Sequence, residues 1–161
     1  MENNRFTVTD DLLASNGQRF VNAIIDLLIQ HIIGLSIAYT ITLLAQVTHW
    51  FTLADWIEDS DFKEQLILGI ILSFCYYCIT EIYFSRSVAK YFTKTLVVMK
   101  DGSKPGSKNV IIRTLCRFIP FEAFTFLGEN ARGWHDYFSD TYVVRKRRFN
   151  VKKKLYDSFA D

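Results

Sequence analysis

The chain has 161 residues, of which 50% are hydrophobic, 16% aromatic and 22% charged, with seven glycines and two prolines. This composition excludes collagen-like, low-complexity and disordered proteins. Residues 1–84 carry three basic and ten acidic side chains, a net charge of −7, whereas residues 85–161 carry sixteen and seven, a net charge of +9. This asymmetry indicates that the two halves of the chain meet different surroundings.

The apolar residues are concentrated in two blocks. Residues 20–45 contain one formal charge, Asp26, and residues 66–84 contain one, Glu81. At a rise of about 1.5 Å per residue, roughly 20 helical residues cross a hydrocarbon core of about 30 Å. Both blocks are therefore predicted to be transmembrane helices. The alternative, two buried helices of a soluble protein, is disfavoured because buried helices this long are rare in small domains.

The charges that flank the two blocks predict their orientation. Residues 56–63 hold three acidic side chains and one lysine, whereas four basic residues, Arg86, Lys90, Lys94 and Lys100, follow the second block. Basic residues concentrate in cytoplasmic loops, so both termini are expected in the cytoplasm. Acidic residues precede the first block, which argues against a cleaved signal peptide.

Shorter elements are predicted at the inner leaflet after the second block. Basic residues recur every fourth position at Arg86, Lys90 and Lys94, with apolar residues between them, as in an amphipathic helix with a basic stripe. Residues 96–98 favour β structure and precede a turn signal at residues 101–102. We expect a short β-ribbon or loop there.

A further helix is expected from Ser107 or Asn109 to residue 118, with Pro120 ending or bending it. Residues 110–127 contain two arginines, a glutamate and a proline. One central arginine costs about 2.5–3.5 kcal/mol on insertion scales, which favours a bent interfacial or re-entrant helix pair over a spanning helix. The predicted fold class is an all-α integral membrane protein with two transmembrane helices, cytoplasmic-leaflet amphipathic or re-entrant helices and a short β-ribbon or loop.

The chain divides into three predicted segments. Residues 1–18 form a cytoplasmic N-terminal segment, residues 19–144 the membrane domain, and residues 145–161 a basic cytoplasmic tail. The basic residues of the tail are Arg145, Lys146, Arg147, Arg148, Lys152, Lys153 and Lys154. Near anionic lipids each contributes about 1 kcal/mol of attraction, so the tail is either a clamp on a membrane or partner, or a solvated segment that only sets topology.

A polar stripe inside the first block is the most informative pattern. Its residues are Arg19, Asn22, Asp26 and Gln30, spaced by three, four and four positions, so they share one helix face. A carboxylate within a membrane needs a cation, hydrogen-bond donors or water, or else it is neutral. With cytoplasmic termini, Asp26 and Glu81 lie in the same leaflet. The sequence therefore predicts a buried polar cluster, in which the available cations are Arg19, Arg86, Lys90, Arg113 and Arg117.

These residues resemble those of a known family, the RDD membrane proteins, named for one arginine and two aspartates. In that family the arginine opens the first transmembrane helix, the first aspartate lies within it, and the second follows a histidine late in the domain. The matching positions are Arg19, Asp26 and Asp136. The resemblance covers residues 15–145. Further similar segments occur in the same order as in the family, at residues 86–90, 96–98, 101–102, 113–117 and 134–143. Ala89 stands where the family usually has a glycine.

The resemblance implies a multi-pass protein of the bacterial inner (cytoplasmic) membrane. Transport has been suggested for the family, some members are associated with ion exchange, and relatives are often found beside other small membrane proteins. We therefore keep two hypotheses: a non-enzymatic subunit or assembly partner of a membrane complex, and an oligomeric proton- or sodium-coupled transporter of ions or small solutes that uses Asp26 and Glu81. The candidate site comprises Arg19, Asn22, Asp26, Gln30, Glu81, Lys90, Arg113, Arg117, Asp136 and Thr141.

No enzymatic activity is predicted. The sequence has no nucleophile elbow, no zinc-protease motif and no glycine-rich phosphate loop. Cys75 and Cys78 lie mid-span, where packing explains them better than redox chemistry or a zinc site. We expect no catalytic residue, no metal, no cofactor and no nucleic acid. The expected partners are the lipid bilayer, anionic lipids, and either further copies of the chain or other membrane proteins.

Overall fold

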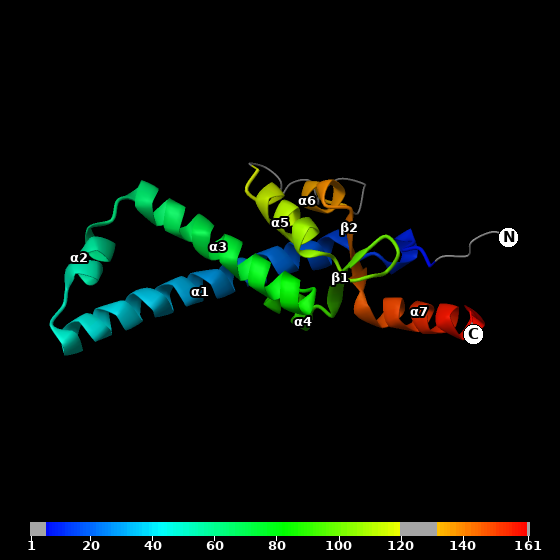
Figure 1. Ribbon diagram of the computed structural model, residues 1–161, viewed down its shortest axis with the longest axis horizontal. Helices are drawn as coiled ribbons and strands as arrows, with labels where there is room; N and C mark the ends of the chain where they lie inside the picture. Colours follow the sequence, from blue (N-terminus) through cyan, green and yellow to red (C-terminus); the bar gives the residue numbers. More distant parts are fainter. Residues whose placement is uncertain (1–5, 120–131, 161) are drawn as a thin grey trace.

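The computed structural model describes residues 6–119 and 132–160 of the chain. Figure 1 shows a mostly helical protein in which two long helices diverge at one end and a two-stranded sheet lies at the other. The described residues thus confirm the expected helical chain with two long apolar helices and a short β-ribbon.

Local sequence signals explain where the two long helices begin. Helix α1, Asn16–Thr48, starts with a capping box in which Ser15 accepts from the Gln18 backbone N–H while the Gln18 side chain accepts from Ser15. Helix α3, Phe62–Phe84, starts with the same arrangement between Asp61 and Glu64. Each helix contains an 18-residue window of mean hydropathy 1.8, and each is long and apolar enough to cross a membrane. A short helix, α2, Thr52–Asp59, joins them where the sequence analysis placed an acidic loop.

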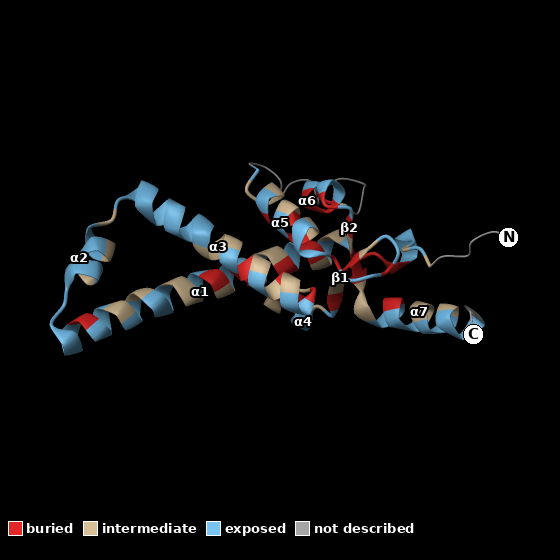
Figure 2. Ribbon diagram, viewed as in Figure 1, coloured by how far each residue is buried: buried red, intermediate tan, exposed pale blue. Residues whose placement is uncertain are grey.

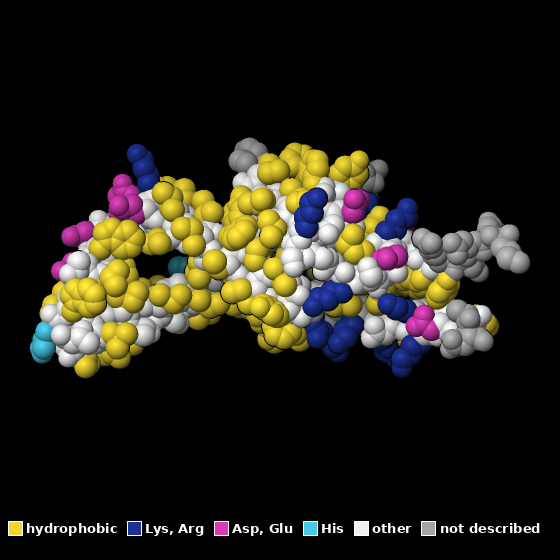
Figure 3. All heavy atoms as spheres, in the orientation of Figure 1, with side chains coloured by type: hydrophobic (Ala, Val, Ile, Leu, Met, Phe, Trp, Pro, Cys, Tyr) yellow, Lys and Arg dark blue, Asp and Glu magenta, His cyan; other side chains and the backbone are white. Residues whose placement is uncertain are grey.

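The long helices expose apolar side chains and bury polar ones. The buried residues of α1 are Arg19, Asn22, Asp26, Gln30 and Ala45. By contrast, Leu27 and Ile32 on the same helix are 63% and 61% exposed. Figure 2 shows the buried residues gathered where α1 meets the later elements, and Figure 3 shows apolar side chains covering the diverging part of α1 and α3. This pattern is the reverse of a soluble helix, whose apolar stripe faces the core.

Most of the remaining elements gather around the N-terminal half of α1 and the C-terminal half of α3, whereas α7 extends away from them beside β2. The remaining elements are a 3-10 helix (Asp10–Leu12), α4 (Val88–Phe92), β1 (Thr95–Met99), α5 (Ser107–Cys116), α6 (Trp134–Phe138), β2 (Thr141–Arg145) and α7 (Lys146–Ala160). Strands β1 and β2 pair antiparallel, with Thr95 opposite Arg145 and Met99 opposite Thr141. The strand expected at residues 96–98 is present, but its partner comes from late in the chain because the turn at residues 101–102 leads toward α5.

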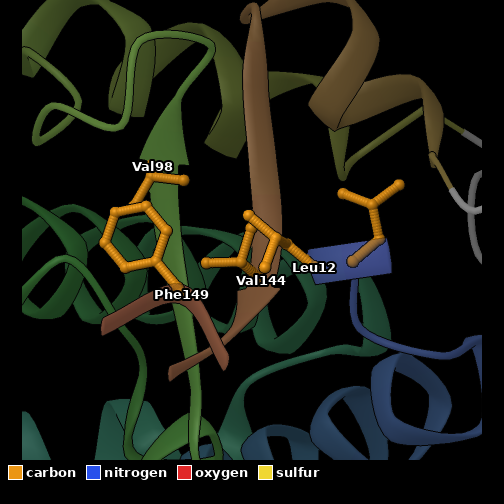
Figure 4. Close-up of a cluster of buried hydrophobic side chains, with 5 residues drawn as sticks. Leu12, Val98, Val144 and Phe149 are labelled. Carbon is orange, nitrogen blue, oxygen red and sulfur yellow. The ribbon is translucent and has the colours of Figure 1, made fainter. Parts of the chain in front are cut away.

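A small apolar core forms beside this sheet. Its buried members are Leu12, Leu13, Val98, Val144 and Phe149, four of which are labelled in Figure 4. The N-terminal segment contributes the two leucines, β1 and β2 the two valines, and α7 the phenylalanine. The described parts of the segments predicted as residues 1–18 and 145–161 therefore pack together against the strands.

The structure corrects the expected basic stripe. Only Val88–Phe92 are helical in this region, and Lys90 is 3% exposed, directed into the protein. Arg86 precedes the helix and stacks on Tyr91, with 3.6 Å between the guanidinium carbon and the ring centroid. Of the helix pair expected over residues 110–127, α5 accounts for the part up to Cys116, while residues 120–127 lie outside the described residues.

Truncation of Phe149 tests how much the tail helix contributes to the fold. Phe149 is 4% exposed, so Phe149→Ala is expected to lower the free energy of unfolding by about 3–5 kcal/mol. The matched variant Phe159→Ala alters the same helix at a side chain that is 83% exposed. It is expected to change the free energy of unfolding by less than about 0.5 kcal/mol. Chemical unfolding of the purified protein measures both. Equal effects of the two variants would contradict this packing of α7.

Candidate functional site

Asp136 lies between two arginines from distant parts of the chain. Arg19 of α1 donates to its Oδ2 atom and Arg113 of α5 donates to its Oδ1 atom, and all three side chains are buried. The His135 Nε2 atom lies 3.3 Å from Oδ1. Burial alone raises the pKa of Asp136, but Arg113, His135 and Arg19 together outweigh it and hold this pKa well below its usual range. Asp136 therefore joins α1, α5 and α6 as a permanent anion.

Arg113 extends these contacts toward α3. Its Nε atom lies 3.0 Å from Glu81 Oε2, and its Nη1 atom also donates to Thr141 Oγ1 at 2.7 Å. The side chain is 1% exposed. One guanidinium thus bridges two carboxylates and a strand hydroxyl, an arrangement suited to the planar, multiply donating group of arginine.

Glu81 is fully buried and contacts three cations. Lys90 Nζ lies 2.5 Å and Arg117 Nη2 2.9 Å from its Oε1 atom, in addition to Arg113. The chain can bring Lys90 there because α3 ends at Ser85 in a left-handed conformation, with φ 56°, which turns the backbone back toward α1. Together, Arg19, Asp26, Glu81, Lys90, Arg113, Arg117 and Asp136 are called the charge cluster below.

Lys90 titrates in a range that experiments can reach. Burial lowers the pKa of Lys90 to about 8, and the nearby charges of Arg117 and Arg113 act in the same direction, while Glu81 opposes them. Lys90 is therefore the weakest cation of the charge cluster, because arginine keeps its proton at any pH at which the protein is folded.

Asp26 is bound by hydrogen-bond donors. Its Oδ1 atom accepts from the Tyr76 hydroxyl at 2.6 Å and from the Ala89 backbone N–H at 3.1 Å, and its Oδ2 atom accepts from the Ser87 hydroxyl at 2.5 Å. The first N–H groups of a helix have no partner within the helix, and a nearby acceptor usually satisfies them. Ser87 occupies the N-cap of α4 without capping it, so Asp26 supplies that acceptor from α1.

The cation expected beside Asp26 is not observed as an ion pair within residues 6–119 and 132–160. Hydroxyl and backbone donors take its place because α4 approaches α1 closely at Ala89, which has no exposed surface. The sequence analysis overlooked Tyr76 and Ser87.

The other candidate residues surround the charge cluster. Asn22 accepts from the Thr93 hydroxyl at 2.6 Å and donates to Thr95 at 3.2 Å, which ties α1 to the start of β1. Gln30 is buried on the same face, beside Tyr77. The basic residues of the tail lie apart, on β2 and α7, where Lys152 pairs with Asp11 at 3.1 Å and Lys153 donates to the Gly102 carbonyl.

These features define a helical protein whose two long apolar helices carry buried carboxylates that cations and hydrogen-bond donors of the same chain contact. Residues 13–140 match the sequence profile of the RDD family, so the chain belongs to the RDD family. Arg19, Asp26 and Asp136, the positions that resemble the family's signature, all lie in the charge cluster, and Arg19 and Asp136 contact each other directly. No curated protein matches the chain, and no solved structure does.

The titration of Lys90 predicts a pH dependence of stability. The folded protein releases this proton near pH 8, whereas the unfolded chain keeps it to about pH 10.5, so unfolding takes up a proton between these values. Stability is therefore expected to rise as the pH increases from 8 to 10. Lys90→Met should flatten that slope, and Lys108→Met, at an exposed site on α5, should leave it unchanged. Unfolding midpoints measured at each pH test this, and a slope that is equal in both variants would contradict it.

Proposed function

We propose that this chain is a small bacterial inner-membrane protein that acts as a non-enzymatic subunit or assembly partner of a membrane complex. Its helices α1 and α3 span the bilayer, both termini are cytoplasmic, and the charge cluster fixes the packing of the later elements against these helices. One observation carries the proposal: each described carboxylate of the cluster is already occupied by arginines, a lysine or donors of this chain.

The exposure pattern of the long helices supports a bilayer as their surroundings. Of the most apolar window of α1 only 6% of the residues are buried in the protein, and of that of α3 only 22%. A soluble protein with such an exposed apolar surface would aggregate or bind a partner. Acidic side chains gather near α2 and basic ones near α7 (Figure 3), and this separation supports the orientation with cytoplasmic termini.

An unfilled groove on α1 supports packing with another membrane helix. It has a volume of about 340 Å³ and is lined by Ile32, Ile33, Ser36, Ile37, Thr40 and Ile41. Figure 3 shows an opening between the diverging parts of α1 and α3. Helices pack closely in membranes where small and hydroxyl side chains line the interface, and Ser36 and Thr40 are of this kind. The neighbouring helix belongs either to a second copy or to another membrane protein.

The alternative function, transport coupled to protons or sodium, assigns the coupling ion to Asp26 and Glu81. A sodium ion requires carboxylate or carbonyl oxygens that are not already paired with cations. Glu81 contacts three cations, and both oxygens of Asp26 accept hydrogen bonds. These contacts favour the assembly role over cation transport.

The proposed topology can be tested with single cysteines in a variant without Cys75, Cys78 and Cys116. A membrane-impermeant maleimide added to spheroplasts is expected to label a Lys63→Cys variant, because the proposed topology places the first turn of α3 on the outer side. A Ser158→Cys variant on α7 should react only after lysis. Labelling of both variants, or of neither, in intact spheroplasts would contradict two spanning helices with cytoplasmic termini.

The assembly role predicts what accompanies the chain when it is extracted gently from membranes. Native mass spectrometry of the tagged protein is expected to show a defined complex, and Asp26→Asn should reduce its yield at least several-fold, because the amide nitrogen of asparagine cannot accept from the Ser87 hydroxyl and its neutral oxygen is a weaker acceptor for the first N–H groups that meet it. Asp55→Asn, at an exposed site on α2, serves as the control and should leave the yield unchanged. A strictly monomeric protein would contradict the proposal. So would sodium- or pH-dependent flux in proteoliposomes that Asp26→Asn abolishes without changing the oligomer.

A further inference from the structure

The helices α4, α5 and α6 bury charged residues on one side and expose large apolar residues on the other. Each buries one member of the charge cluster, which is Lys90 on α4, Arg113 on α5 and Asp136 on α6. Phe92, two positions after Lys90, is 71% exposed, and Tyr137, directly after Asp136, is 66% exposed. The apolar collar below denotes six exposed side chains of these helices: Phe92, Ile111, Leu115, Trp134, Tyr137 and Phe138.

The apolar collar continues the exposed apolar surface of the two long helices. On α1, Ile24 is exposed two positions before the buried Asp26. On α3, Phe84 is exposed three positions after the buried Glu81. Helix α4 packs on α1 and α5 packs on α3, so the collar adjoins both long helices. Figure 3 shows apolar side chains over α4 and α6 as well as over α1 and α3. Apolar surface therefore surrounds the charge cluster on several sides.

Exposed charged residues mark where this apolar surface ends. Lys94, which directly precedes β1, is exposed two positions after Phe92. Asp140, which directly precedes β2, is exposed two positions after Phe138. Lys94 and Asp140 lie at opposite ends of the antiparallel pair, whose strands run across the long axis of the molecule (Figure 1). On α5 the exposed Lys108 lies in the first turn, before the collar residues of that helix. The sheet thus lies at the level at which charged side chains replace apolar ones on the surface.

We infer that the apolar collar contacts the acyl chains of the inner leaflet, so that the charge cluster lies at the depth of the hydrocarbon and the sheet at the level of the headgroups. This inference rests on the proposed function only in taking α1 and α3 as spanning helices. Large exposed apolar surfaces mark contacts with lipid or with protein. Acyl chains are favoured over a protein partner because the collar comes from three separate helices and is continuous with the exposed apolar surface of both long helices.

This depth accounts for the contacts of the charge cluster. Ionised side chains within a membrane are unfavourable unless they pair with one another or with hydrogen-bond donors, because water is absent there. Glu81 and Asp136 pair with cations of the chain, and Asp26 accepts from donors of the chain. A cluster at the cytoplasmic surface would instead have water as a further partner.

Tryptophan fluorescence tests the depth of the collar in the full-length protein in phosphatidylcholine nanodiscs. The substitutions Trp50→Phe and Trp56→Phe leave Trp134 as the only tryptophan. Lipids with brominated acyl chains should quench most of its emission, whereas aqueous iodide should have little effect. The matched control adds Trp134→Phe and Phe159→Trp, which places the tryptophan at an exposed site on α7, and iodide alone should quench it. Quenching of Trp134 by iodide alone, or by neither agent, would overturn the inference. The second result would show that protein covers the collar.

Spin labels test the position of α4 independently. Phe92→Cys and Phe159→Cys, in the variant without the three native cysteines, place a nitroxide at two exposed phenylalanine sites, one on α4 and one on α7. Oxygen concentrates in hydrocarbon, whereas a neutral nickel chelate stays in water. Oxygen should therefore relax the label on α4 several-fold more than nickel does, and the order should reverse on α7. Stronger relaxation by nickel on α4, or relaxation by neither reagent, would contradict contact with acyl chains.

A third label, Ile32→Cys on α1, separates this inference from the proposed function. Ile32 lies within the most apolar part of the chain and is exposed. If oxygen dominates at Ile32 but nickel dominates at Phe92, the helices span the bilayer and the inference about the collar fails. If nickel dominates at both sites, the spanning helices themselves are wrong. The tryptophan measurement keeps the native cysteines, so it decides the outcome if the cysteine-free variant does not fold.

Discussion

The ion pair between Arg19 and Asp136 is the interaction on which the rest of the structure depends. The two residues are 117 positions apart, and their contact brings the start of the first long helix against the last helix before β2. Arg113 forms an ion pair with the same carboxylate and a second ion pair with Glu81 on α3. Because breaking one member of a buried pair leaves another charge uncompensated, these residues stabilise the fold as a group rather than as separate contacts.

Asp26 has a different part in the same architecture. Its carboxylate accepts from the Ala89 backbone N–H of α4 and from two hydroxyls, so it orders the turn that follows α3. That turn places Lys90 beside Glu81, and Thr93 beside Asn22. The first helix therefore positions the cations indirectly, by holding the backbone that carries them.

Much of this arrangement follows from periodicity and charge, and the remainder depends on contacts that a single sequence does not reveal. The spacing of Arg19, Asn22, Asp26 and Gln30 predicts one polar face, and in the structure all four are buried. The pairing of β1 with β2 could not be predicted, because residues 96–98 contain no information about a partner strand more than forty positions away. Lys90 was predicted both in a basic surface stripe and among the cations of the buried cluster. The stripe is wrong because four-residue spacing implies a long helix, whereas α4 has five residues.

The order in which the chain is made gives the late position of Asp136 a consequence. Arg19 and Asp26 leave the ribosome first, and Glu81 follows well before Arg117, which lies 36 positions beyond it. Throughout that interval the helices hold charges whose counterparts have not yet been synthesised, so the ion pairs of the cluster cannot be completed until Asp136 has been made. A product shortened before residue 136 retains both apolar helices but leaves Arg19 and Arg113 without the carboxylate that they share.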